Sequence, residues 1–139
     1  MSAAFVIDCS VAMTWLFKDE VTAHTRAILD RLDTETALVP AWWFLELTNV
    51  IALSERKGRI TPGDTAKFIG DVSKLDLEVD MESAERAFER LLPLCRTHKL
   101  TSYDAVYLDL AIRRQLPLAS LDEPLRKAAK KVGVKLLGR

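Results

Sequence analysis

The regular alternation of strand-like and helix-like segments constrains the fold of this chain more than any other feature. Short apolar runs rich in branched and aromatic residues predict strands, beginning with AFVID at residues 4–8. The other strand-like segments are 37–40, 76–80, 116–122 and 134–138. Strands that alternate with helices indicate an α/β fold in which helices cover both faces of a parallel sheet.

Helices are predicted in the intervals between these strands. They cover residues 11–17, 22–32, 41–57, 61–75, 82–99, 102–115 and 123–133. Ser10 and Thr61 are the expected N-caps of their helices, since a hydroxyl can accept from a free amide of the first turn. Gly58 is expected to end one helix in the left-handed conformation, and Pro93 is expected to kink or divide another.

Length and composition favour one globular domain spanning residues 1–139. The chain is 49% hydrophobic and 29% charged, and a chain of this length buries a core without disulfides or a structural metal. No apolar run approaches the roughly 18 residues of a membrane span. Cys9 and Cys95 have no metal-binding spacing, and no export signal is visible, so we expect reduced thiols in a cytoplasmic protein.

Charge is unevenly distributed although the formal net charge is zero. Residues 123–139 contain six basic residues and one acidic residue, a net charge of +5. Two interpretations fit this segment. It can bind a polyanion, or it can be the solvated face of a surface helix.

Three acidic residues lie where strands end or helices begin. Asp8 ends the first predicted strand and Asp122 ends the segment 116–122, so parallel strands would bring both carboxylates to one edge of the sheet. Asp104 lies in the first turn of the helix at 102–115. Each acid taken alone also has a structural explanation, because carboxylates cap helices and favour their first turns.

Glu46 is harder to explain as a cap. A helical wheel places it on an apolar face beside Trp42 and Val50, where an isolated carboxylate must be protonated, paired with a base or bound to a cation. Its own helix has no basic residue before Arg56, although a base from a distant segment is an alternative. Carboxylates without neighbouring His or Cys suit Mg²⁺ or Mn²⁺, which can activate water and offset charge on a phosphodiester.

Three stretches together resemble a PIN-domain protein of the VapC toxin type: FVIDCSVAMTWLFKDE, VPAWWFLELTNVIALSERKGRI and LTSYDAVYLDLAIRRQLPLASLD. The resemblance implies a PIN-like, three-layer α/β/α fold with a mostly parallel central sheet. It also implies that Asp8, Glu46 and Asp104 bind metal, with Asp122 as a fourth acid of the catalytic site and Ser10 as a supporting residue.

The activity implied by this resemblance is Mg²⁺- or Mn²⁺-dependent hydrolysis of RNA by the toxin of a toxin–antitoxin pair. Such proteins form homodimers and are silenced by a small cognate antitoxin that inserts a segment near the acidic cleft. The stretch AWWFLEL is apolar nearly all round, which predicts a helix buried on more than one side and favours a subunit interface there.

Two other functions remain as alternatives. A signalling receiver domain has similar length and an acidic Mg²⁺ site, but it would need adjacent acids after the first strand. Here Asp8 stands alone, and the mid-chain acid Glu46 lies inside a helix. The other alternative is a PIN-like fold that binds a partner without catalysis, and the intact acids argue against it.

Overall fold

The computed structural model describes residues 2–138, and within them four parallel strands form one sheet in the order β3-β2-β1-β4. The strands are β1 (Phe5–Ile7), β2 (Ala37–Pro40), β3 (Leu77–Asp80) and β4 (Leu118–Ala119). Phe5 pairs with Ala37 on one side of β1, and Val6 pairs with Leu118 on the other. The first strand therefore lies in the middle of the sheet.

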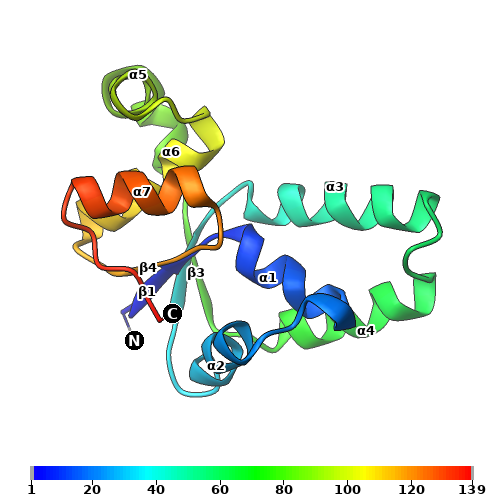
Figure 1. Cartoon of the computed structure of the whole chain (residues 1–139). Helices are drawn as coiled ribbons and strands as arrows, with labels where there is room; N and C mark the ends of the chain where they lie inside the picture. Colours follow the sequence, from blue (N-terminus) through cyan, green and yellow to red (C-terminus); the bar gives the residue numbers. More distant parts are fainter. Residues whose placement is uncertain (1, 139) are drawn as a thin grey trace.

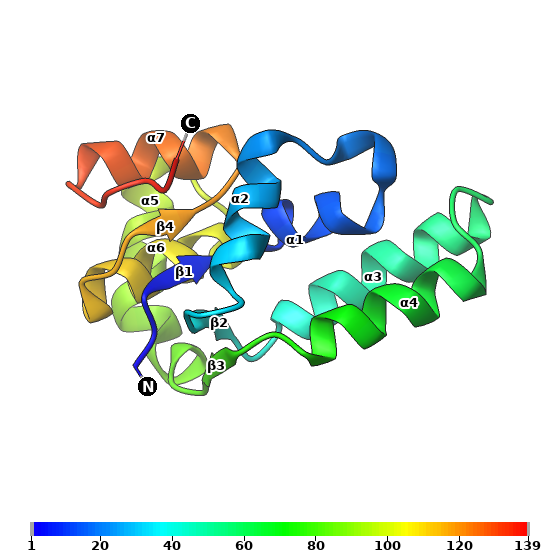
Figure 2. The same cartoon turned by 90° about the horizontal axis from the view of Figure 1, so that it is seen from below.

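Helices flank the sheet on both sides, which confirms the predicted three-layer α/β/α fold. Helices α1 to α4 lie on one side of the sheet and α5 to α7 on the other (Figures 1 and 2), and α1 contacts α2, α3 and α4. The helices are α1 (Cys9–Leu16), α2 (Ala23–Arg31), α3 (Trp43–Arg56), α4 (Pro62–Ser73), α5 (Leu92–His98), α6 (Ser102–Arg114) and α7 (Glu123–Lys131). Shorter helical turns are η1 (Lys18–Glu20), η2 (Ser83–Arg86) and η3 (Ala87–Leu91).

The core covers both faces of the central strands, and helix α6 packs on one of these faces. Every residue of β1 and β2 is buried, which explains why these strands are continuous apolar runs instead of alternating ones. In α6, residues 105–111 are all buried, and the helix packs against β1, β2 and β4. The first turn of α6 and the end of β1 are thus positioned relative to each other by this buried contact.

Several predicted helix boundaries are confirmed. Thr61 caps α4 by accepting from the amide of Asp64, and Pro62 occupies the first turn. Gly58 has a φ of 70°, the left-handed conformation expected after α3. Pro93 lies in the first turn of α5, and the segment predicted as one helix at 82–99 is divided into η2, η3 and α5.

Three local predictions are wrong. Residues 134–138 form no strand, because β4 has only two residues and offers a single bridge, between Leu118 and Leu136. The segment 116–122 is accordingly mostly loop. Ser10 does not cap α1, since that helix begins at Cys9 with Asp8 in the cap position. Within residues 2–138, no helix has the length and apolar character needed to cross a bilayer.

Candidate active site

Asp8 lies at the carboxyl end of β1, where its buried side chain is held by two serines. It occupies the N-cap position of α1, but its carboxylate makes no capping hydrogen bond. The Oγ atoms of Ser10 and Ser120 both donate to Asp8 Oδ2, at 2.8 and 2.7 Å. Ser120 directly follows β4, so these hydrogen bonds join the ends of two adjacent strands.

Ser10 has a different role from the predicted cap. Besides donating to Asp8, its Oγ accepts from the amide of Leu121 at 2.9 Å. It therefore connects the first turn of α1 to the loop that follows β4.

Asp122 lies in that same loop and caps α7. Its Oδ2 accepts from the amide of Leu125 at 3.0 Å, which confirms the capping explanation considered from the sequence. Its own amide donates to Ser120 Oγ at 3.0 Å. Because Ser120 also binds Asp8, one serine fixes the relative positions of both acids.

Glu46 lies in the first turn of α3 and is half-buried. Its Oε1 accepts from the hydroxyl of Tyr107 at 2.9 Å. Tyr107 is fully buried in α6, one turn after Asp104, so the two side chains share a face of that helix. Across residues 2–138, no Lys or Arg forms an ion pair with Glu46; its neighbour is a neutral phenol.

The carboxylates of Asp8, Glu46, Asp104 and Asp122 form one electrostatic cluster, which we call the acidic edge. Burial, followed by repulsion from Asp8 and Asp104, raises the pKa of Glu46 to about 7 despite the hydrogen bond from Tyr107. Burial and repulsion from Asp122 and Asp8 raise the pKa of Asp104 to about 6. Burial also raises the pKa of Asp8, and its two serine hydrogen bonds oppose this shift.

The chemistry of the acidic edge fits a hard divalent cation. Its side chains offer only oxygen atoms, and none of its four acids is ion-paired within residues 2–138. In that same part of the chain, no three His, Cys, Asp or Glu side chains are gathered closely enough to hold an ion. The four acids thus interact as repelling charges, and a cation would relieve that repulsion.

Cys9 lies beside the acidic edge but is not placed as a nucleophile. Its Sγ donates to the carbonyl of Trp43 at 3.3 Å, and burial raises the pKa of the thiol. The thiolate needed for attack is therefore disfavoured. The hydroxyl of Tyr107 lies 3.5 Å from Cys9 Sγ, so the thiol is part of the packing around Glu46.

Tyr107, Ser120 and Arg126 are the site neighbours that sequence reasoning missed. Arg126 is buried and its Nη1 donates to the carbonyl of Ser120 at 2.8 Å. Tyr107 had a sequence signal, since it lies three residues after Asp104 on the same helical face. Ser120 and Arg126 had none, because their contacts depend on where the loop after β4 turns.

A second group of buried acids, which we call the arginine cluster, lies along the other end of α6. Its acids are Asp80 and Asp109, and its basic residues are Arg90 and Arg113. Arg113 bonds Asp109 at 3.3 Å and Asp80 at 3.4 Å, and Arg90 bonds Asp109 at 3.2 Å. Next to this cluster, Arg114 pairs with Glu78 at 2.8 Å. Arg113 and Arg114 are therefore committed to protein carboxylates.

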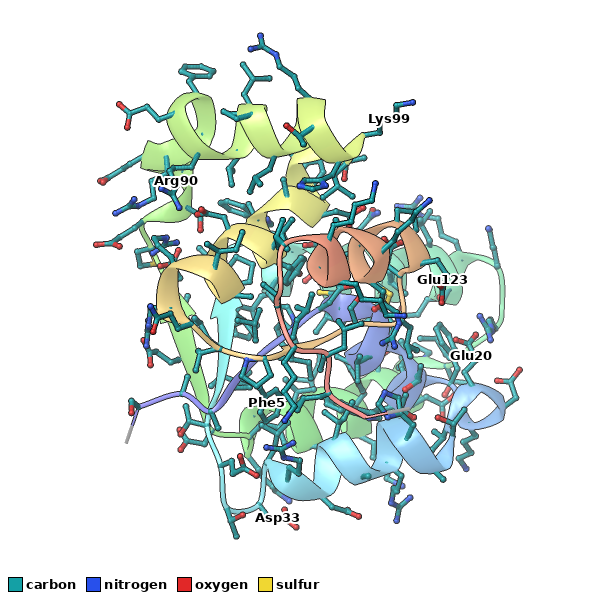
Figure 3. All side chains as sticks on the ribbon, turned by 60° about the vertical axis from the view of Figure 1, so that its left-hand side comes forward. Phe5, Glu20, Asp33, Arg90, Lys99 and Glu123 are labelled. Carbon is teal, nitrogen blue, oxygen red and sulfur yellow. The ribbon has the colours of Figure 1, made fainter. Side chains whose placement is uncertain are left out.

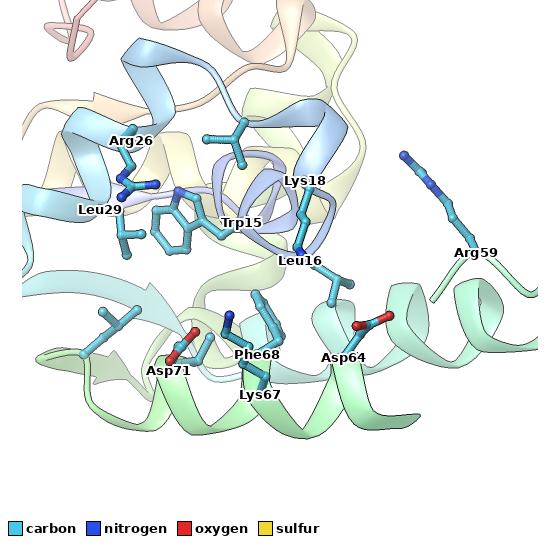
Figure 4. Close-up of a pocket in the computed structure, with 13 residues that line it drawn as sticks. Trp15, Leu16, Lys18, Arg26, Leu29, Arg59, Asp64, Lys67, Phe68 and Asp71 are labelled. Carbon is cyan, nitrogen blue, oxygen red and sulfur yellow. The ribbon is translucent and has the colours of Figure 1, made fainter. Parts of the chain in front are cut away.

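An apolar groove of about 620 Å³ lies away from the acidic edge, between α1, α2 and α4 (Figure 4). Trp15 and Phe68 line its floor, and none of the four acids of the acidic edge borders it. Its rim carries Arg26 and Lys67 together with Asp71. The groove offers an apolar surface bordered by charges of both signs.

The aromatic stretch at the start of α3 is only partly buried. Trp43 is fully buried, whereas Phe44 is 41% exposed and Leu45 is 69% exposed. One side of this helix start is therefore exposed in a single chain, and its burial in a subunit interface stays a prediction. The exposed pair forms an apolar surface at the start of α3.

Comparison with known proteins identifies the family of the chain and solved structures with a similar fold. The family model described as PIN domain matches residues 5–131. The chain is similar to PAE2754 from Pyrobaculum aerophilum, with a TM-score of 0.68 and 19% identity over 92% of this chain and 87% of that one. It is also similar to VapBC2 from Rickettsia felis bound to a DNA fragment from their promoter, with a TM-score of 0.66 and 13% identity over 96% of each chain. No curated protein matches the chain.

Proposed function

The chain belongs to the PIN-domain family, and from this premise we propose that it is a Mg²⁺- or Mn²⁺-dependent endoribonuclease acting as the toxin of a toxin–antitoxin pair. PIN domains are generally nucleases and usually use divalent metal ions. The observation that carries the proposal is the acidic edge, where four carboxylates repel one another and have no cationic partner in residues 2–138.

Asp8, Glu46, Asp104 and Asp122 are the residues that would hold the cation. A divalent ion bound there supplies positive charge to the phosphodiester and promotes ionisation of the attacking water. Ser10 and Ser120 orient Asp8, and Tyr107 orients Glu46, so three hydroxyls limit the rotation of two of the four acids. The raised pKa of Glu46, about 7, means that its carboxyl is partly protonated near neutral pH in the metal-free chain, and a bound cation would displace that proton.

Metal binding is the first test of this proposal, because it needs no knowledge of the RNA target. Mn²⁺ is titrated into the parent protein and into the Glu46→Gln and Asp104→Asn variants, and water-proton relaxation measures bound metal. We expect binding by the parent and its loss in both variants. Asp33→Asn is the matched control, since Asp33 is an exposed acid outside the acidic edge. Equal binding by all four proteins would contradict the assigned ligands.

RNA cleavage is the second test, and total cellular RNA serves as substrate so that a single structured target is not missed. New 5′ ends are mapped after incubation with the parent or with Asp104→Asn, in Mn²⁺ or in chelator. We expect new 5′ ends only with the parent protein in Mn²⁺, and none with Asp104→Asn or in chelator. Metal binding without any new end would leave the PIN-fold binding module as the better function.

The receiver alternative is tested by incubation with a small phosphodonor. Fold and family both argue against it, since the chain is a PIN domain and Asp8 has no adjacent acid. We expect no aspartyl phosphate.

We further propose a small antitoxin protein as partner. The fold shared with VapBC2 supports it. The resemblance places one antitoxin segment near the acidic edge, and the apolar groove between α1, α2 and α4 offers a further surface for an apolar segment. Affinity capture with the tagged protein from cells that express it, followed by identification of small co-purifying proteins, tests it. Val21→Glu, at a groove residue that is 36% exposed, should weaken the complex while the free protein stays folded.

A homodimer, a cytoplasmic location and a single domain over residues 1–139 remain predictions. Exposed Phe44 and Leu45 support the dimer, because an apolar surface of this kind is typical of subunit contacts. Light scattering on the parent and on Leu45→Glu tests it. A single apolar core running from Ala3 to Leu137 supports the one-domain organisation.

A further inference from the structure

A strongly basic groove of about 700 Å³ lies between the end of α5 and helix α7. One wall carries His98 and Lys99, and the other carries the basic residues of α7, which are Arg126, Lys127, Lys130 and Lys131. Glu123 is the single acid that lines it. Figure 3 labels Lys99 and Glu123, one residue from each wall, both toward the right-hand side of the view. We call this feature the basic groove.

The lysines of the basic groove are not used to neutralise the protein's own acids. Lys99, Lys127, Lys130 and Lys131 are exposed, and none forms an ion pair in the part of the chain that the structure describes. Arg113 and Arg114, in contrast, are paired with carboxylates. Positive charge that is concentrated in a groove and left unpaired attracts a polyanion.

Hydrogen bonds link the basic groove to the acidic edge, although none of the four acids lines the groove. Arg126 connects the two, since it donates to the carbonyl of Ser120, whose Oγ donates to Asp8. Asp122 caps the helix that forms one wall, and Lys127, Lys130 and Lys131 follow it along α7. With a rise of about 1.5 Å per residue, these lysines lie roughly 7 to 14 Å along the helix from Asp122.

The opposite wall approaches the acidic edge in the same way. Lys99 ends α5, and Asp104 follows five residues later in the first turn of α6. Both walls therefore run from basic residues to an acid of the acidic edge. A strand whose phosphodiester lay at that edge would continue into the basic groove.

Lys99 has a backbone conformation that favours glycine. Its φ is 56°, in the left-handed region, at the C-cap of α5. A lysine in this conformation is explained if its ammonium group binds an anion in the basic groove. The other non-glycine residue with positive φ among residues 2–138, Gln115, ends α6 and does not line the groove.

We infer that the basic groove binds the phosphate backbone of the RNA strand next to the bond that is cut. The inference rests on the proposed ribonuclease function and adds to it the path of the substrate. Recognition is by charge and is independent of base sequence, because lysine ammonium groups contact phosphates and not base edges. An acidic segment of a protein partner is the competing occupant, and the test below separates the two.

Binding is measured in an Asp104→Asn background, which prevents cleavage, by the fluorescence anisotropy of a short labelled oligouridine at several salt concentrations. The test variant is K127Q/K130Q/K131Q. Its control is R56Q/K57Q/K74Q, which removes three exposed charges at the ends of α3 and α4. We expect the test variant to bind about 10-fold more weakly or worse, with a log–log salt slope smaller by about 2, while the control binds as the parent does.

Lys99→Gly gives a second variant whose fold should not suffer. Glycine relieves the left-handed backbone, so the melting temperature should stay equal or rise, whereas RNA affinity should fall several-fold. Gln115→Gly is the matched control, with the same backbone change and no loss of charge. A loss of affinity in Lys99→Gly alone assigns the effect to the ammonium group.

The outcomes separate this inference from the proposed function. If the parent cleaves RNA and the triple variants bind oligouridine equally, the basic groove is not the substrate path and the nuclease proposal stands. If K127Q/K130Q/K131Q loses RNA affinity but the parent produces no new RNA ends, the groove binds RNA and the nuclease proposal fails. If oligouridine does not bind and labelled oligoglutamate binds through these lysines, the groove receives a protein segment and the inference is overturned.

Discussion

The acidic edge and the arginine cluster are built from the same residue type and differ in whether the chain supplies a cation. In the arginine cluster, Arg113 bonds both Asp80 and Asp109, and Asp109 is fully buried. At the acidic edge, Asp8 is almost as deeply buried, but its partners are the neutral hydroxyls of Ser10 and Ser120. One group of acids is neutralised within the fold and the other is not.

The pKa shifts in the two regions have opposite signs. Burial acts to raise the pKa of Asp80, but hydrogen bonds from Ser83 and Arg113 outweigh it, so the pKa is lowered. The hydrogen bond from Arg114 likewise lowers the pKa of Glu78. The pKa values of Glu46 and Asp104 are raised. Acids whose repulsion is left uncompensated are typical of a functional site, whereas paired acids serve the fold.

Removing the shared cation of the arginine cluster should have the largest effect. Arg113→Met leaves Asp80 and Asp109 buried without their common partner, which should lower the free energy of unfolding by about 3 to 5 kcal/mol. Urea denaturation followed by circular dichroism measures it. Arg56→Met, at an exposed position, is the control. A loss below about 1 kcal/mol would mean that the cluster does not hold the fold as described.

Removing a charge from the acidic edge should affect catalysis and leave stability intact. Asp104→Asn should reduce metal-dependent RNA cleavage by about 10²- to 10³-fold, on the scale of losing one electrostatic contact to a transition state. The free energy of unfolding should stay equal or rise, because repulsion from Asp8 and Asp122 is removed. Cleavage kinetics and urea denaturation on one preparation give both values. An Asp104→Asn protein with full activity would remove this acid from the proposed site.

Most of the fold could be predicted because its signals are local. Residues 37–40 have the predicted strand boundaries, and Thr61 caps α4 as expected, since each depends on apolar runs and capping chemistry a few residues apart. The strand expected at 134–138 failed for a non-local reason. A strand needs a neighbour to pair with, and β4 is too short to pair beyond Leu118.

The candidate site was partly predictable in the same sense. Topology brings the ends of β1 and β4 to one edge of the sheet, so the proximity of Asp8 and Asp122 could be expected from their positions after strands. The hydroxyl of Tyr107 on Glu46 could not, because it depends on how α3 packs against α6. Nor could the pairing of Arg113 with Asp80, which joins α6 to the end of β3.

Hydroxyl groups that orient the acids should matter at the acidic edge and not in the arginine cluster. Ser120→Ala removes a donor to Asp8, and Tyr107→Phe removes the donor to Glu46, so each should weaken Mn²⁺ affinity by about 10- to 100-fold. Ser83→Ala is the matched control, because Ser83 donates to Asp80 at 2.6 Å from an equally buried position. Metal titration compares the three. If Ser83→Ala weakened binding as much, the effect would be one of general stability.

The smallest expected effect is on the pH dependence of stability, where the two regions should act in different pH ranges. Glu46 and Asp104 bind protons more tightly in the folded chain, so their contribution is fully present below pH 4 and is lost as the pH rises through about 6 and 7. Asp80 and Glu78 have lowered pKa values, so their contribution is present above about pH 4.5 and is lost in stronger acid. Between pH 5 and pH 8, the carboxylates that change stability are therefore those of the acidic edge.

Over that range, the free energy of unfolding of the metal-free parent should fall by on the order of 1 kcal/mol, since solvent around half-buried Glu46 screens part of the repulsion. The informative quantity is the difference between the parent and a Glu46→Gln/Asp104→Asn variant, which retains every other titratable group of the chain. Between pH 5 and pH 8, the free energy of unfolding of the variant should fall less than that of the parent, because the two carboxylates are absent. Saturating Mn²⁺ should flatten the parent in the same way, because a bound cation replaces the protons that otherwise relieve the repulsion. If the variant and the parent had the same slope, the acids of this edge would be as well neutralised as those of the arginine cluster, and the contrast between the two regions would not exist.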